Sequence, residues 1–183
     1  DFFNQHIEAA VQLDCDHMVV STGFAYLDVD AEDAFGWCAE AMGRIARKAE
    51  QEGVTLAVEP FTKYTTHICN EASQLRRLLR TVNSPRLTGL ADTDVIATTA
   101  VDTFSTFLDV IGPENLGHVH FVDGNPGGHL VPGDGVLDLD GALEKLKAIH
   151  YTGALGLEVL DRRYVFAPEA AMKQAMDWYK ERI

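Results

Sequence analysis

Short apolar runs alternate with longer amphipathic stretches along this sequence, and the alternation constrains the fold more than any other feature. Apolar residues between the runs recur every three or four positions, which is the spacing of helices that bury one face. Strands that alternate with helices indicate βαβ units and a parallel sheet. The five runs predicted as strands are 17–23, 54–60, 86–92, 117–123 and 154–160.

The number of units limits the choice of α/β architecture. A closed (β/α)₈ TIM barrel has eight strands and typically about 250 residues, whereas this sequence has 183. We therefore predict a single domain over residues 1–183 that represents the C-terminal five or so β/α units of a TIM barrel, with the first three units absent. An open doubly wound sheet is the alternative, but the positions of the polar residues favour the barrel.

The apolar spacing and the turn residues also predict where the helices lie. Asn70 is a plausible N-cap for the third helix, Gly53 should close the second, and Pro168 suits the first position of the last. The helices are expected over 3–11, 34–49, 75–82, 101–111 and 143–149, and from 168 onward.

Metal-binding residue types close four of the five apolar runs. In a parallel barrel the active site lies at the C-terminal ends of the strands. Glu59 and Glu158 indicate a shared centre, because a carboxylate inside an apolar run must be paired, hydrated or bound to metal. Asp92 alone is equally consistent with a helix N-cap.

Two histidines, His118 and His120, lie on the same face of the fourth run, since side chains alternate along a strand. His120 is nearer the strand end and is the predicted ligand. His118 is predicted to lie in the core or beside the ligands, and it is a candidate substrate-binding residue.

Glu59, Asp92, His120 and Glu158 therefore form an oxygen-rich ligand set for one divalent metal ion. Such a set suits Mn²⁺ first, and Mg²⁺, Co²⁺ or Zn²⁺ are compatible. The set contains no thiolate, which argues against a structural zinc site.

A long loop follows the histidine-containing run, with the sequence DGNPGGHLVPGDGVLDLDGAL from Asp123. Its glycines and prolines exclude a regular strand or helix. Long loops on the active face of a barrel often carry substrate contacts, and His129 is the predicted substrate-binding residue of this one. The alternative is a solvated connector.

Charge and cysteine content restrict the partners and the compartment. Fifteen basic and 28 acidic residues give a net charge of −13, which disfavours nucleic acid as a partner. No apolar run reaches the roughly 18 residues of a membrane span, so no membrane partner is expected. The three cysteines are widely spaced, which favours a reducing cytoplasm over a disulfide framework.

Several segments follow one another in an order that carries a family resemblance. They are Glu59-Pro60, Asp92-Thr93, HVHFVDG at 118–124, VPGDGVLD at 131–138 and YTGALGLEVL at 151–160. With them the chain resembles the xylose-isomerase-like TIM-barrel superfamily of sugar isomerases and epimerases, and within it the ketose 3-epimerases and their fructoselysine relatives.

The resemblance implies that Glu59, Asp92, His120 and Glu158 are metal ligands. It also implies that the two glutamates are the acid and base residues, and it places His129 where relatives often have a substrate-binding arginine. Two positions depart from the family pattern.

These departures concern positions that touch substrate in ketose epimerases. Val95 stands where relatives often have a histidine, and Thr65 stands where many have a glutamate. Both favour a less typical branch over a free-ketose substrate.

The predicted function is a metal-dependent epimerase or isomerase of a small sugar or sugar phosphate. It would abstract a proton next to a carbonyl and pass through an enediolate. Alternatives are an aldose–ketose isomerase or an inosose-type dehydratase. A metal-dependent endonuclease is disfavoured by the charge. The last alternative is a truncated chain that folds poorly or serves only as a binding module. Five strands leave two open sheet edges that would favour pairing, and a homo-oligomer is compatible with the sequence.

Overall fold

A computed structural model describes residues 2–182 of the chain, so the first and last residues of the predicted domain lie outside it. Five strands form one sheet in the order β1-β2-β3-β4-β5, and every neighbouring pair is parallel. The strands are β1 (His17–Ser21), β2 (Thr55–Glu59), β3 (Leu87–Asp92), β4 (Leu116–His120) and β5 (Leu155–Gly156). All five predicted strands are therefore confirmed, with β5 much shorter than its apolar run.

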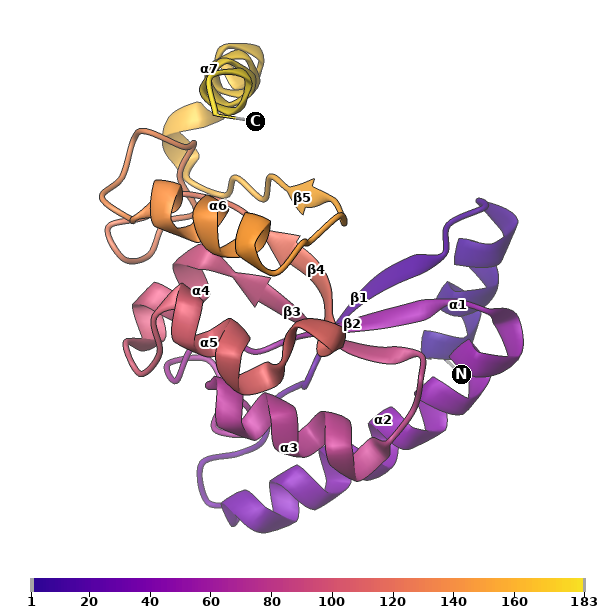
Figure 1. Ribbon diagram of the computed structural model, residues 1–183. Coiled ribbons are helices and arrows are strands. Elements are labelled where there is room, and N and C mark those ends of the chain that lie inside the picture. The colour runs from indigo at the N-terminus through magenta and orange to yellow at the C-terminus, as the bar shows by residue number, and fades with distance from the viewer. Residues whose placement is uncertain (1, 183) are drawn as a thin grey trace.

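The order of the strands distinguishes the two predicted architectures. A doubly wound sheet reverses its strand order at a switch point, whereas here each strand pairs with the next one in the sequence. Most of the helices also contact the next helix or the next but one along the chain, and they lie along the outer side of a curved sheet (Figure 1). The fold is thus a partial (β/α) barrel, as predicted.

Seven α-helices and two short 3₁₀ turns accompany the strands in residues 2–182. The α-helices are α1 (Phe2–Gln12), α2 (Ala31–Glu52), α3 (Ala72–Val82), α4 (Thr93–Thr99), α5 (Phe104–Ile111), α6 (Leu139–Ala148) and α7 (Pro168–Lys180). The 3₁₀ turns are η1 (Pro113–Asn115) and η2 (Arg162–Tyr164).

Of the three residues predicted to begin or end a helix, Gly53 and Pro168 are correct and Asn70 is wrong. Gly53 closes α2 with φ 76°, a left-handed conformation that glycine adopts without steric cost. The prediction of Asn70 as the N-cap of α3 is wrong, because Glu71 occupies that position. The Asn70 side chain instead donates to the carbonyls of Phe61 and Thr66, and so fastens the loop after β2.

Helix α4 was not predicted, because its sequence TDVIATT is rich in β-branched residues with low helix propensity. It forms directly after β3, where the Asp92 side chain caps it by accepting from the backbone N–H groups of Asp94 and Val95. The helix predicted over 101–111 begins only at Phe104, where Thr103 caps α5 by accepting from the N–H of Thr106.

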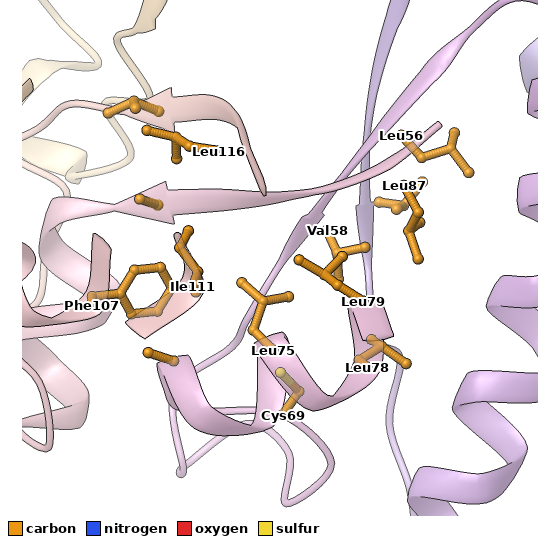
Figure 2. Close-up of a cluster of buried hydrophobic side chains, with 14 of the residues drawn as sticks. Leu56, Val58, Cys69, Leu75, Leu78, Leu79, Leu87, Phe107, Ile111 and Leu116 are labelled. Carbon is orange, nitrogen blue, oxygen red and sulfur yellow. The ribbon is translucent and has the colours of Figure 1, made fainter. Parts of the chain in front are cut away.

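The main hydrophobic core lies between the sheet and its helices (Figure 2). Leu56 and Val58 of β2 and Leu75 of α3 are fully buried there. Side chains alternate along a strand, so Glu59, next to Val58, faces away from this core. The same alternation separates Val119 in the core from His120. Other core residues shown in Figure 2 are Cys69, Leu78, Leu79, Leu87, Phe107, Ile111 and Leu116.

None of the helices between residues 2 and 182 combines the length and the apolar character that a membrane crossing requires.

Candidate metal centre

Four metal-binding side chains meet at the C-terminal edge of the sheet. Glu59, Asp92 and His120 are the last residues of β2, β3 and β4. The parallel register places Asp92 directly beside His120. Glu158 lies two residues beyond the short β5. Each of the four offers one ligand atom, and these atoms all lie within 4.8 Å of one another.

His120 lies among the three carboxylates. Its Nδ1 is 3.1 Å from Glu59 Oε1, 3.2 Å from Glu158 Oε2 and 3.5 Å from Asp92 Oδ2. Glu59, Asp92 and His120 are buried, while Glu158 is partly exposed. Three carboxylates around one imidazole leave the centre short of positive charge, and buried charge of one sign is costly unless a cation compensates it.

Asp92 caps a helix with one carboxylate oxygen and faces the candidate centre with the other. Its Oδ1 accepts from the N–H groups of Asp94 and Val95 and thereby caps α4. Its Oδ2 is buried without a hydrogen-bond partner of good geometry among the described residues. An unsatisfied buried carboxylate oxygen at the mutual centre of four possible ligands fits a bound cation. The cluster therefore suits a metal ion, although its role as a ligand set stays a prediction.

The electrostatics of the centre follow from the crowding of its carboxylates. Hydrogen bonds from His120 and His129 lower the pKa of Glu158 to about 2. Burial disfavours the charged form of His120, but its contacts with the carboxylates of Asp92, Glu158 and Glu59 outweigh this effect and raise its pKa to about 11. Burial raises the pKa of Glu59. The site therefore strongly favours a positive charge among its carboxylates.

His129 reaches this centre from the long loop after β4. Its Nε2 is 3.3 Å from Asp92 Oδ2 and 3.4 Å from Glu158 Oε2, and its Nδ1 is 3.0 Å from Asp94 Oδ2. Burial acts against a charge on the ring, but its contacts with the carboxylates of Asp92, Asp94 and Glu158 raise the pKa of His129 to about 12. Contacts with three carboxylates therefore hold His129 within the candidate centre, and its contact with substrate stays a prediction.

His118 lies one pleat before His120 on β4, on the same face of the strand. The two rings are 5.3 Å apart between centroids and perpendicular. The His118 ring is partly buried, and burial lowers its pKa. The structure thus places His118 beside His120, and its contact with substrate stays a prediction.

Two aspartates that the sequence did not single out hold the loop that carries His129. Asp94 and Asp123 are both buried, and each accepts hydrogen bonds from several loop N–H groups. The N–H groups of a glycine-rich loop need acceptors, and this general requirement was the only feature of the sequence that pointed to buried aspartates such as Asp94 and Asp123.

The chain matches one family along almost its whole length. The family model described as "Xylose isomerase-like TIM barrel" covers residues 1–182. A fructoselysine 3-epimerase of Shigella flexneri is 26% identical over 182 residues, which are 98% of this chain and 65% of that protein. A ketose 3-epimerase of Arthrobacter globiformis is 30% identical over 118 residues, which are 64% of this chain and 39% of that protein.

Among solved structures, the apo form of 3-keto-D-glucoside 4-epimerase from E. coli is similar in fold. The TM-score is 0.86 at 20% identity, and the match covers 98% of this chain and 69% of that one. The chain spans somewhat less than two thirds of the length of the fructoselysine 3-epimerase described above.

Proposed function

The chain belongs to the xylose isomerase-like TIM barrel family, and on this premise we propose that it catalyses epimerisation of a small sugar or sugar phosphate at a carbon next to a carbonyl group. The observation that carries the proposal is the pair Glu59 and Glu158, both in contact with His120 inside one four-residue centre. The names of the two sequence relatives, both 3-epimerases, support the same reaction class.

Glu59, Asp92, His120 and Glu158 would hold one divalent ion, with Mn²⁺ the first choice for a centre of three carboxylates and one imidazole. When bound, the ion supplies Lewis-acid stabilisation of the negative charge that develops on the substrate oxygens. The buried Oδ2 of Asp92, which no hydrogen bond of good geometry from the described residues satisfies, supports this assignment.

Inversion at carbon needs one base on each face of a planar enediolate. Glu59 and Glu158 come from β2 and from the segment after β5, which are separated by two intervening strands of the sheet. We assign proton removal to one glutamate and proton return to the other. His129, and less directly His118, would bind substrate oxygens.

The test uses solvent exchange. The full-length protein with Mn²⁺ should incorporate deuterium from D₂O at C3 of a ketose or ketose phosphate. Incorporation at C1 would indicate aldose–ketose isomerisation instead. Loss of a hydroxyl group as water would indicate a dehydratase.

Matched variants distinguish the loss of a catalytic base from a general effect of removing a negative charge. Glu59→Gln and Glu158→Gln should each lower turnover by at least about 10²-fold, because each removes one positioned base. Glu144→Gln, on the exposed side of α6, is the control and should leave turnover unchanged. A Glu158→Gln protein with full metal occupancy and unchanged epimerisation would refute the two-base assignment.

A further inference from the structure

Asp94 is a buried carboxylate whose hydrogen bonds go to the loop after β4. It lies in the first turn of α4, two residues after Asp92, and is 1% exposed. Its Oδ1 accepts from the N–H of Gly127, and its Oδ2 accepts from the N–H of His129 at 3.0 Å. The same Oδ2 is 3.0 Å from Nδ1 of the His129 ring. Asp94 therefore fixes both the backbone and the ring of His129.

The loop backbone is shaped around this carboxylate. A Cβ at Gly124 would lie 1.9 Å from Asp94 Oδ1, so only glycine allows so close an approach. His129 itself has φ 48°, in the left-handed region that residues other than glycine rarely adopt. The N–H of His129 bonds to Asp94 in this conformation, so the contact with Asp94 stabilises a backbone that the residue alone would disfavour.

The orientation of the ring is what links Asp94 to the metal centre. With Nδ1 turned to Asp94, Nε2 points to the space beside Asp92 Oδ2 and Glu158 Oε2. A carboxylate that binds one ring nitrogen fixes the direction and the hydrogen position of the other, as is common for histidines at metal sites.

We infer that Asp94 is a positioning residue, which holds the His129 ring so that Nε2 faces the substrate oxygen bound between Asp92 and Glu158. This inference rests on the proposed function for the substrate, but the pairing of Asp94 with His129 does not. Asp94 acts through His129 and touches neither substrate nor metal.

The first test examines the ring without any substrate. In ¹H–¹⁵N spectra of histidine-labelled protein, His129 is assigned by the signals that vanish in His129→Asn. Asparagine tolerates the left-handed backbone and leaves the N–H bond to Asp94 in place, so this variant should fold. The wild type should show a hydrogen-bonded Nδ1–H, and Asp94→Asn should lose that signal. An Nδ1 without a bound hydrogen in the wild type overturns the pairing even if Asp94→Asn does not fold.

The second test is a double-mutant cycle on turnover in the full-length protein. Asp94→Asn should lower kcat about 10- to 100-fold with a smaller change in KM, as losses of such orienting partners typically do. His129→Asn should lower kcat at least as much, and adding Asp94→Asn to it should have no further effect.

A purely structural role of Asp94 gives the opposite result in the cycle. The two losses would then multiply, because a disordered loop harms the site even without the imidazole. That outcome overturns the inference. If the wild type exchanges no ketose proton at all, the proposed function fails, while the nitrogen spectra still decide whether Asp94 positions the ring.

Discussion

Replacing Asp123 by asparagine tests how firmly the loop after β4 is held. Asp123 is buried, and its two oxygens each accept two backbone N–H groups. Oδ1 accepts from Gly124 at 2.8 Å and Leu137 at 3.0 Å, and Oδ2 accepts from Gly133 and Gly135 at 3.0 Å each. One carboxylate therefore joins both ends of a loop that has little regular structure of its own.

The magnitude follows from the bonds that asparagine cannot make. Its amide keeps one oxygen, but it presents an NH₂ group to the other two N–H groups, so two charge-assisted hydrogen bonds are lost. Each such bond contributes about 1.5–3 kcal/mol, which gives a loss of about 3–6 kcal/mol in the free energy of unfolding. Urea denaturation measures this as a shift of the midpoint at constant slope.

Asp138→Asn is the matched control for the same chemical change. Asp138 caps α6 by accepting from the N–H of Gly141 at 2.9 Å at an exposed position. Asparagine and aspartate are nearly equal as N-caps, so the control should change stability by less than about 0.5 kcal/mol. If Asp123→Asn costs less than about 1 kcal/mol, the carboxylate does not hold the loop and the reasoning is wrong.

Three further outcomes are expected. Gly117→Ala should cost about 1–3 kcal/mol in urea denaturation, because its Cβ would lie 2.7 Å from Cβ of Thr88, and a neutral result would contradict this packing. Ellman's reagent should modify one thiol in the native chain, the exposed Cys15, and three in denaturant. Burial protects the other two thiols and raises the pKa of Cys38 to about 11, so fast modification of Cys38 or Cys69 at pH 8 would refute their burial. Mn²⁺ at 100 times its Kd should stabilise the chain by about 2.7 kcal/mol, reversibly with EDTA, and the absence of a shift would count against the metal centre.

The sequence predicted the strand ends well because the apolar runs and their terminal polar residues follow local rules. Glu59, Asp92 and His120 close three strands and meet at one edge for that reason. Glu158 was placed at a strand end by the same logic, yet β5 pairs over only two residues and the glutamate lies beyond it. Strand length at the edge of a sheet depends on neighbours that an apolar pattern does not encode.

The arrangement around His129 could not be derived from local patterns. Asp94 binds a loop more than thirty residues away in the sequence, so its contacts appear only after β3 and β4 have paired. The prediction of Asn70 as an N-cap was wrong for a related reason. Its side chain donates to carbonyls of the preceding loop, and capping preferences do not take such loop contacts into account.

The sequential strand order has a consequence for synthesis on the ribosome. Each strand pairs with the one made just before it, so the units can dock one after another as the chain emerges, without waiting for a distant partner. The four residues of the candidate centre are then delivered in the order Glu59, Asp92, His120 and Glu158. Capture of an ion by all four would be possible only after the segment that carries Glu158 has left the ribosome, so metal binding would follow the docking of these five strands.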